Sequence, residues 1–297
     1  MNILLGEMKK TLIPDSEHSF SVLIVNDGSS SNGDIKPVEG IEVKVLNLVR
    51  NLGHQKSIAC GLGYIRENLE YDKVLILDAD GEDTPADAKR LLQESISKPD
   101  KIILGQRTSR QETNSFRFFY RLYKTAFRLL TGRRITFGNF MVIPKVQLEK
   151  LVYYSEIWSH LAGGILKSGL AFSTVSCHRG KRYVGNSKMS FHGLLMHGLG
   201  AIAVFIETIA GRLLVFSLIL IGISVLAILA LAGIKLFTDK AIPGWTSTVM
   251  SAMLIILLQS FLLSLFTIFL YLSSQSQRKF IPALHYKDYT GSVESIQ

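Results

Sequence analysis

Hydrophobic and polar positions follow two different patterns along this chain. Charged side chains recur every few positions before residue 213, whereas residues 213–234 and 241–277 contain none. About 20 apolar residues are enough to span the hydrocarbon core of a bilayer. The pattern therefore excludes a purely soluble protein and predicts a soluble region followed by two membrane spans.

Before the two spans, short apolar runs of strand length alternate with stretches that suit a helix. The expected strands cover residues 21–25, 43–48, 74–77 and 102–104, and the helices between them include residues 56–68 and 86–97. Strands and helices that alternate at this spacing predict a mostly parallel α/β sheet. In such sheets, ligands bind at the carboxyl ends of the strands.

Acidic side chains follow two of the expected strands. Asp27 comes just after the first strand, and residues 78–83 place four carboxylates directly after the third. Carboxylates this close repel one another unless a cation binds, and oxygen ligands favour Mg²⁺ or Mn²⁺. The alternative is an acidic loop that caps a helix, with Asp83 or Thr84 as the N-cap and Pro85 in the first position. Because carboxylates follow two separate strands, a metal and nucleotide site is favoured.

Five short motifs carry a resemblance to a known family. They are VNDGS at 25–29, RNLGHQ at 50–55, DADGED at 78–83, GQR at 105–107 and RYVGNSK at 182–188. In this order the chain resembles the family 2 glycosyltransferases of the GT-A fold. Within that family it is similar to the polyprenyl-phosphate sugar synthases, since the last motif precedes two spans. The resemblance implies an α/β, GT-A domain followed by two C-terminal transmembrane helices.

The resemblance also implies roles for individual residues. The nucleotide site would be formed by Val25, Asp27, Asp78, Ala79 and Arg107. Mg²⁺ or Mn²⁺ would be held by Asp78, Asp80 and Glu82, and the catalytic residues would be Asp80 and Asp83, the latter as a supporting or acid/base group. The acceptor phosphate would be bound by Arg182, Ser187 and Lys188. For Arg182 and Lys188, the alternative is that they are ordinary solvated charges. His54 is expected to make a structural hydrogen bond.

The implied activity is inverting transfer of a sugar from a nucleotide-diphosphate sugar to a polyprenyl phosphate, undecaprenyl or dolichyl. Such a reaction at the cytoplasmic membrane face would serve cell-envelope or glycan assembly. A lipid phosphate is already anionic, so the reaction needs little help from a general base. One alternative is a processive polysaccharide synthase, which two spans and the lack of a Gln-x-x-Arg-Trp motif disfavour. The other is a catalytically inactive, membrane-anchored relative. The expected partners include no nucleic acid, and a homo-oligomer stays open.

Two stretches depart from the family pattern. Relatives begin with an apolar strand that ends in Pro-x-Tyr-Asn, whereas this sequence starts with what looks like a helix. Loss of a central strand would leave a ladder of unpaired backbone groups, so we expect that the sequence starts inside the protein. Residues 138–141 read Gly-Asn-Phe-Met where relatives commonly have Gly-Asp-Phe-Arg. Any role of that missing carboxylate and arginine is therefore in doubt.

Four regions are expected along the chain. They are a GT-A domain at 1–188, an interfacial amphipathic helix at 189–212, a transmembrane hairpin at 213–277 and a cytoplasmic tail at 278–297. Arg212 precedes the first span, and Arg278 and Lys279 follow the second. The positive-inside rule therefore favours a multi-pass protein of the cell membrane, inner or plasma, with a cytoplasmic catalytic domain.

Most of the net charge of +9 falls between residues 101 and 134. Within this stretch, residues 115–134 place basic and apolar side chains at helical spacing, which predicts an amphipathic helix with a cationic face. Anionic lipid headgroups are the favoured partner because two spans follow. RNA binding and simple packing on the domain are the alternatives.

Overall fold

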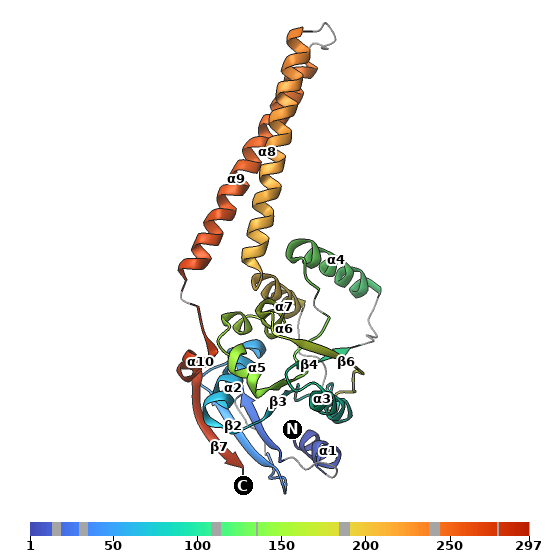
Figure 1. The fold of residues 1–297 in the computed structure, drawn as a ribbon, viewed down its shortest axis with the longest axis vertical. Helices are drawn as coiled ribbons and strands as arrows, with labels where there is room; N and C mark the ends of the chain where they lie inside the picture. Colours follow the sequence, from blue (N-terminus) through green and yellow to red (C-terminus); the bar gives the residue numbers. More distant parts are fainter. Residues whose placement is uncertain are drawn as a thin grey trace. The chain divides into compact units, whose positions relative to one another are not determined.

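The computed structural model describes residues 1–13, 19–29, 35–107, 114–134, 136–183, 191–237, 244–277 and 279–296. They form two compact units (Figure 1). The first comprises Met1–Thr125, Arg133–Val204 and Lys279–Gln297, and the second comprises Ala126–Gly132 and Phe205–Arg278. The first unit is a mixed α/β domain, and the second is built on two long apolar helices.

The described residues of the first unit form two β-sheets. In one, β1 (Ser21–Asn26) pairs in parallel with β2 (Glu42–Leu48), which also pairs antiparallel with β7 (Thr290–Ile296). The other has the order β3-β5-β4-β6 and consists of β3 (Lys73–Ile76), β5 (Met141–Pro144), β4 (Ile102–Arg107) and β6 (Phe172–Cys177). The α/β class is confirmed, but the sheets are mixed rather than mostly parallel. The reason is that β5 and β7, which the apolar pattern did not predict, run antiparallel to their neighbours.

Helices surround these sheets, and every strand and helix expected from the apolar pattern is present with slightly shifted bounds. The helices of this unit are α1 (Asn2–Leu12), α2 (His54–Asn68), α3 (Pro85–Ser97), α5 (Lys145–Leu151), α6 (Leu161–Ser168), α7 (Phe191–Ala203) and α10 (Pro282–His285), with 3₁₀ turns η1 (Ser155–Trp158) and η2 (Tyr286–Tyr289). The predicted helix at 115–134 is α4 (Asn114–Thr131), which contributes residues to both units.

Strand β4 is buried on both of its faces. Ile102 and Leu104 belong to an apolar cluster that includes Leu62 of α2 and Leu161 of α6. Ile103 belongs to a second cluster, which includes Leu91 of α3. Because side chains alternate along a strand, this run of apolar residues requires helices on both sides of the sheet. The packed layers hold β4 between helices on both faces of the sheet.

Strands β1 and β3 each pair on one side only within the described residues. The apolar side chains of β1 are only partly buried, whereas Val43 and Val45 of β2 are fully buried. An open strand edge leaves backbone groups without ladder partners. The expected family strand upstream of Met1 stays a prediction.

The segment after the second apolar helix returns to the α/β unit. In addition to the β2–β7 pairing, Phe280 stacks on Trp158 with ring centroids 3.6 Å apart, and the Tyr286 hydroxyl donates a hydrogen bond to Oε2 of Glu67 over 2.9 Å. The sequence assigned residues 278–297 to a cytoplasmic tail. In the structure, Lys279–Gln297 is an integral part of the first unit.

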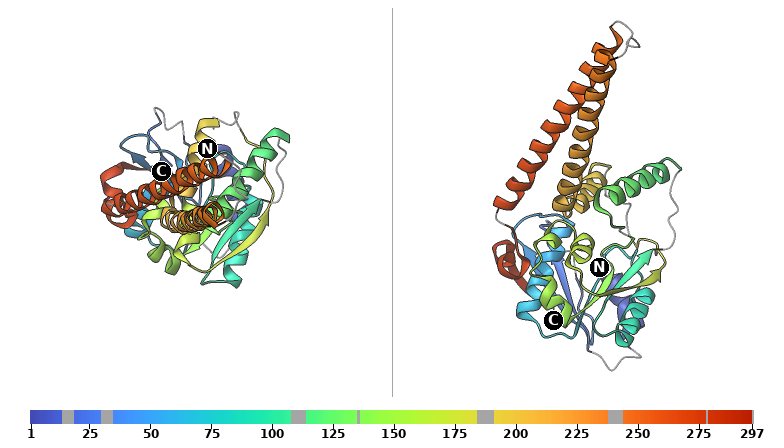
Figure 2. Two further views of the ribbon diagram at one scale, coloured as in Figure 1. Left: turned by 90° about the horizontal axis from the view of Figure 1, so that it is seen from above. Right: turned by 45° about the horizontal axis from the view of Figure 1, so that its top comes forward.

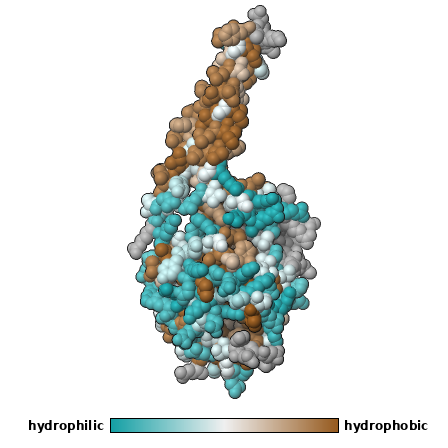
Figure 3. Space-filling view, in the orientation of Figure 1, coloured by the Kyte–Doolittle hydropathy of each residue, from teal (hydrophilic) through white to brown (hydrophobic). Residues whose placement is uncertain are grey.

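The second unit contains α8 (Ile206–Phe237) and α9 (Trp245–Ser276), which lie alongside each other (Figures 1 and 2). Both are long and apolar enough to cross a membrane. Small polar residues such as Ser217, Ser224, Ser260 and Ser264 are buried, whereas most large apolar side chains face outward. Figure 3 shows this hydrophobic surface, in contrast to the mostly hydrophilic surface of the α/β unit. Small residues inside and large apolar residues outside are typical of helices that pack within a bilayer.

The expected interfacial helix at 189–212 is divided in the structure. α7 ends at Ala203 and α8 starts at Ile206, so the first apolar helix begins before Arg212. In the second unit, Nη1 of Arg212 donates a hydrogen bond to the carbonyl oxygen of Leu129 over 2.8 Å. Leu129 lies in the last turn of α4, where carbonyl groups lack partners within the helix and attract cations. Arg212 therefore holds the end of α4.

Candidate active site

The loop between β3 and α3 carries the acidic motif, which we call the acidic loop (residues 78–84). It is shaped by its own carboxylates: Oδ2 of Asp83 accepts a hydrogen bond from the Asp78 amide over 3.0 Å, and Oδ1 of Asp80 accepts one from the Glu82 amide over 2.9 Å. Gly81 turns the chain with a φ of +89°. The side chains of Glu82 and Asp83 are consequently buried rather than solvated.

The alternative reading, a loop that caps a helix, applies to the end of the acidic loop. Thr84 is the N-cap of α3, and its hydroxyl accepts a hydrogen bond from the Asp87 amide over 3.2 Å, with Pro85 in the first helical position. The capping reading is thus confirmed for Thr84. It does not account for Asp78, Asp80 and Glu82, because their carboxylates make other contacts.

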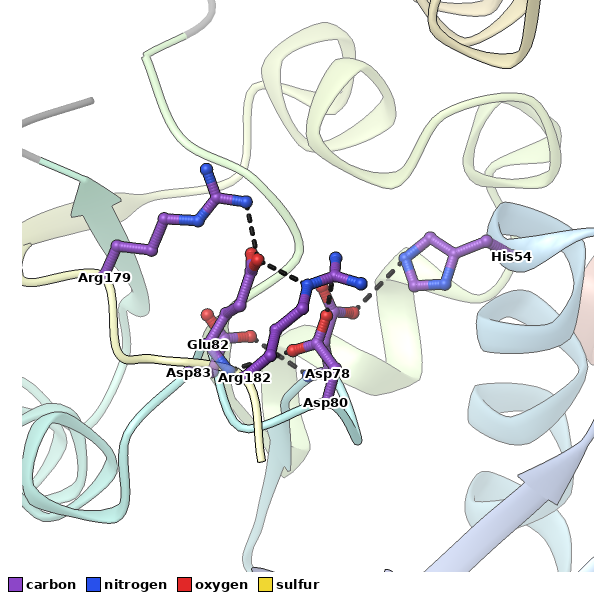
Figure 4. Close-up of polar contacts among 7 residues, drawn as sticks. All are labelled: His54, Asp78, Asp80, Glu82, Asp83, Arg179 and Arg182. Atoms are coloured by element: carbon purple, nitrogen blue, oxygen red, sulfur yellow. Dashed lines mark hydrogen bonds and ion pairs between the residues drawn. The ribbon is translucent and has the colours of Figure 1, made fainter. Parts of the chain in front are cut away.

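Two arginines that follow β6 neutralise the acidic loop. Arg182 lies 2.9 Å from Oδ2 of Asp80 through Nη2 and 2.7 Å from Oε1 of Glu82 through Nε (Figure 4). Nη2 of Arg179 lies 2.6 Å from the same Glu82 oxygen. The structure therefore brings Arg182 to the predicted metal ligands and adds Arg179, which the sequence analysis did not single out.

These ion pairs shift the proton affinities of their members. Burial alone would raise the pKa of Glu82, but hydrogen bonds from Arg179 and Arg182 outweigh it and lower the pKa below the usual glutamate value. The hydrogen bond to Glu82 raises the pKa of Arg182 further. Both groups are therefore fully charged at neutral pH, as expected for charge-assisted hydrogen bonds.

The backbone around the arginines also lies against the acidic loop. The Gly180 amide donates to the Glu82 carbonyl over 2.9 Å, and the Tyr183 amide donates to the Asp80 carbonyl over 3.0 Å. A Cβ on Gly81 would come within 2.5 Å of the Tyr183 ring, and one on Gly180 would come within 2.6 Å of the Gly81 carbonyl oxygen. Glycine at both positions thus permits this close approach.

His54 borders the other side of the acidic loop (Figure 4). Its Nε2 lies 3.4 Å from Oδ1 of Asp78 and 2.8 Å from Nδ2 of Asn139. The expected structural hydrogen bond is present, and it involves Asn139, the residue that departs from the family pattern. His54 starts α2, so this contact connects α2 to the acidic loop.

Asp27 makes a different kind of contact. Its Oδ1 accepts a hydrogen bond from the Leu52 amide over 2.6 Å, and its Oδ2 accepts one from the Gly53 amide over 2.9 Å. Gly53 is the N-cap of α2, where backbone amides attract negative charge. Burial, and then the charge of Asp27, raise the pKa of Cys60 to about 12. Asp27 thus joins the loop after β1 to the start of α2.

The other predicted site residues are only partly placed. Val25 lies in β1 and packs against the apolar cluster around Leu46 and Cys60, and Ala79 lies within the acidic loop. Arg107 ends β4 opposite Cys177 of β6, so its backbone lies at the same sheet edge as the segment with Arg179 and Arg182. Its side chain, Ser187 and Lys188 lie outside the described part of the structure.

The donor chemistry of the acidic loop suits a hard divalent cation, because carboxylates are oxygen ligands, and two of these carboxylates face a cationic group. That cationic group is the Arg182 guanidinium. Within the described ranges, no three His, Cys, Asp or Glu side chains are placed together as a metal site. A divalent cation at Asp80 therefore requires Arg182 to move, and the metal ligands stay a prediction.

Comparisons with known proteins agree on one family. Residues 7–154 match the family model described as Glycosyl transferase family 2. YkcC, an uncharacterized glycosyltransferase of Bacillus subtilis (strain 168), is 25% identical over 260 residues, which cover 82% of this chain and 76% of that protein. YkoT, an uncharacterized glycosyltransferase of the same organism, is 26% identical over 257 residues, 82% of this chain and 72% of that protein.

A third relative has a more specific name. The undecaprenyl-phosphate 4-deoxy-4-formamido-L-arabinose transferase of Pseudomonas fluorescens (strain SBW25) is 26% identical over 182 residues, which cover 58% of this chain and 51% of that protein. The α/β unit, with its carboxylates at a strand end, is thus the catalytic domain of a glycosyltransferase. The chain belongs to glycosyltransferase family 2. The resemblance and the enzyme class expected from the motifs are both confirmed.

Proposed function

We propose that this enzyme transfers a sugar from a nucleotide-diphosphate sugar to a polyprenyl phosphate at the cytoplasmic face of a cell membrane. The observation that carries the proposal is that one chain joins a family 2 domain to two helices long and apolar enough to cross a membrane. The Pseudomonas relative, named for undecaprenyl phosphate, supports a lipid phosphate as the acceptor.

The reaction would be a single displacement with inversion. An oxygen of the lipid phosphate forms a bond to the anomeric carbon of the sugar while the bond to the nucleoside diphosphate breaks. Asp78, Asp80 and Glu82 would hold Mg²⁺ or Mn²⁺, and such an ion stabilises charge that develops on the leaving diphosphate. Val25, Ala79 and Arg107 would bind the nucleotide portion, as the family motifs imply, and Asp27 would serve the same site by holding the Leu52 and Gly53 amides at the start of α2.

The chain's own residues would do the remaining work. Arg182, Ser187 and Lys188 would bind the acceptor phosphate, and bidentate arginine contacts suit phosphate groups. Asp80 would act in catalysis through the divalent cation, which it would help to hold beside the leaving diphosphate. Asp83 would support catalysis by keeping the acidic loop in shape, because its carboxylate already accepts the Asp78 amide.

The proposed orientation rests on the basic residues beside the apolar helices. Arg212 lies near the start of α8, and Arg278 and Lys279 follow α9. The positive-inside rule then favours both flanks, and with them the catalytic domain, on the cytoplasmic side. Thiol labelling of an Ala241→Cys variant in intact cells tests this orientation, since a cysteine introduced in the 238–243 connection should react from outside.

Sugar transfer into lipid tests the proposed activity. The full chain in nanodiscs is incubated with a panel of radiolabelled nucleotide sugars and either undecaprenyl or dolichyl phosphate, with and without a chelator. We expect label in the organic phase that depends on the lipid phosphate and is lost with the chelator. Undecaprenol, which lacks the phosphate, is the matched control.

The same assay separates the alternatives. Label in a growing water-soluble polymer, without labelled lipid, would indicate a processive polysaccharide synthase. If no donor is consumed by enzyme that still binds a nucleoside diphosphate, the chain is a catalytically inactive relative.

A further inference from the structure

The segment Arg179–Tyr183 lies along the acidic loop and contacts it through both backbone and side-chain atoms. Two backbone hydrogen bonds, from Gly180 and Tyr183, join it to the loop, and two arginines reach back to the carboxylates. Asp87 extends the attachment, because its Oδ2 accepts a hydrogen bond from the His178 amide over 2.9 Å. The arginines are thus held beside the carboxylates by the local fold, and the contact is not a chance surface pair.

The carboxylate oxygens that pair with the arginines are also those that would bind a divalent cation. Oδ2 of Asp80 lies 2.9 Å from Nη2 of Arg182, and Oε1 of Glu82 accepts from both Arg179 and Arg182. A divalent cation binds carboxylate oxygens at about 2.1 Å and would face these guanidinium groups across the same oxygens. Like charges this close repel strongly where water is partly excluded. The cation and the two arginines therefore compete for Asp80 and Glu82.

A nucleoside diphosphate removes this competition. It brings several negative charges of its own, and guanidinium groups bind phosphate oxygens in the same paired geometry as carboxylates. Once the diphosphate is present, each arginine can exchange a carboxylate partner for a phosphate partner without losing a charged contact. The carboxylates then become available to a cation.

We infer that Arg179 and Arg182 form a latch on Asp80 and Glu82 that keeps the divalent cation out until a nucleoside diphosphate arrives. The inference rests on the proposed function, since it takes the nucleotide donor and the cation from there. Glu82 pairs with both arginines of the latch. Arg179 thereby has a role that the family motifs did not assign. The latch makes binding of cation and nucleotide strongly cooperative, because each removes the obstacle to the other.

Direct cation binding tests the latch without any need for activity. Mn²⁺ binding to the full chain in nanodiscs is followed by electron paramagnetic resonance, first alone and then with UDP or GDP. For Arg182→Gln, we expect Mn²⁺ affinity without nucleotide to rise about tenfold and nucleotide affinity to fall, within the usual range of coupling between two sites. Arg179→Gln should give the smaller rise, because Arg179 pairs with Glu82 but with no second carboxylate among the described residues.

Arg66→Gln is the matched control. Arg66 pairs with Glu149 over 3.0 Å, its side chain is 29% exposed against 27% for Arg182, and the substitution changes the net charge equally. Its Mn²⁺ affinity should equal that of the unmodified chain. Arg182→Lys keeps the positive charge and should stay near the unmodified chain as well. If Arg182→Gln fails to fold, Arg179→Gln, whose side chain is more exposed, carries the test.

The outcomes distinguish the latch from the proposed function. Unchanged or weaker Mn²⁺ binding in folded Arg182→Gln and Arg179→Gln overturns the latch, even if the unmodified enzyme transfers sugar to lipid. A rise in Mn²⁺ affinity supports the latch even if lipid transfer is never observed, in which case the proposed function is wrong. A rise of equal size in Arg66→Gln means that net charge alone is responsible, and it also overturns the latch.

Discussion

Two loops at the carboxyl ends of strands carry carboxylates. The groups that stabilise these negative charges differ between the two loops. After β1, Asp27 is neutralised by the backbone amides of Leu52 and Gly53. After β3, Asp80 and Glu82 are neutralised by the side chains of Arg179 and Arg182. Backbone amides are fixed by the fold, whereas arginine side chains rotate among rotamers.

This difference separates a carboxylate with a structural role, Asp27, from carboxylates whose arginine partners can be replaced by a ligand, Asp80 and Glu82. Removing the partners of Asp27 would require α2 to lose its first turn, since Gly53 is the N-cap of that helix. Exposing Oδ2 of Asp80 and Oε1 of Glu82 requires two long side chains to turn toward another anion. We therefore expect substitutions in the first loop to affect stability and substitutions in the second loop to affect activity and ligand binding.

The largest effect is expected for Asp80→Asn. Asparagine keeps an oxygen that can accept the Glu82 amide, so the loop should fold normally, but the charge that the reaction needs is lost. We expect kcat to fall by about 10²- to 10³-fold, the usual loss when a charge-stabilising group leaves an active site. Sugar transfer into lipid measures it. Asp72→Asn, at the opposite end of β3, is the control, and full activity in Asp80→Asn would remove Asp80 from the catalytic site.

Asp27→Ala should give the next largest effect, and on stability instead. It leaves the Leu52 and Gly53 amides without their acceptor, which costs about 2 to 4 kcal/mol at the usual penalty for lost partners. The chain has two tryptophans, Trp158 in the first unit and Trp245 in the second. Denaturant titration followed by Trp158 fluorescence in a Trp245→Phe background therefore reports on the α/β unit.

Asp27→Asn tests whether the loss of stability follows the number of acceptor oxygens at this position. It retains one acceptor oxygen and should lose about half as much stability as Asp27→Ala. A variant that keeps full stability but loses nucleotide binding would contradict the structural assignment of Asp27 and favour a direct nucleotide contact.

The sequence was sufficient to locate both loops but not their partners. Each loop follows a short apolar strand, and both the strand and the carboxylates are visible within a few residues. The partners are distant: Leu52 follows Asp27 by 25 positions, and Arg179 follows Glu82 by 97. Only the tertiary fold decides which amide or arginine meets which carboxylate. A weak signal for Arg179 existed, since it stands in the basic run that leads into the motif at Arg182.

A similar contrast explains why the apolar helices were predicted well and β7 was missed. A bilayer imposes its requirement on each helix separately, so composition within one segment is enough to identify α8 and α9. β7 is an exposed strand at a sheet edge, with the sequence Thr-Gly-Ser-Val-Glu-Ser-Ile. It buries little and shows no apolar alternation, so its pairing with β2 leaves no local pattern to detect.

The pH dependence of stability tests the arginine contacts of the second loop. Because the folded pKa of Glu82 lies below its unfolded value, its contribution is fully present above the unfolded pKa and is lost as pH falls through the folded pKa. As pH falls from about pH 6 through the unfolded and then the folded pKa of Glu82, the stability advantage of the unmodified chain over Glu82→Gln should therefore shrink toward zero. At about pH 6 we expect a difference of about 1 to 3 kcal/mol in the same Trp158 titration. A constant difference across this range would mean that the Glu82 charge does not hold the arginines.

The smallest effect is expected for a substitution in β7, which is connected to the first loop through side-chain hydrogen bonds. Asn47 of β2 accepts a hydrogen bond from Nδ2 of Asn26 over 2.9 Å and donates one to Oε1 of Glu294 in β7 over 2.7 Å. The Asn26 side chain in turn accepts the Ser29 amide over 3.0 Å, directly beyond Asp27. Glu294→Gln keeps an acceptor and removes only the charge of an exposed side chain, so stability should fall by less than about 1 kcal/mol. Activity should not change, because this chain of contacts supports backbone that is already fixed by Asp27. A loss of activity comparable to that of Asp80→Asn would show that the first loop, like the second, acts directly in activity. The proposed difference between a structural first loop and a functional second loop would then be wrong.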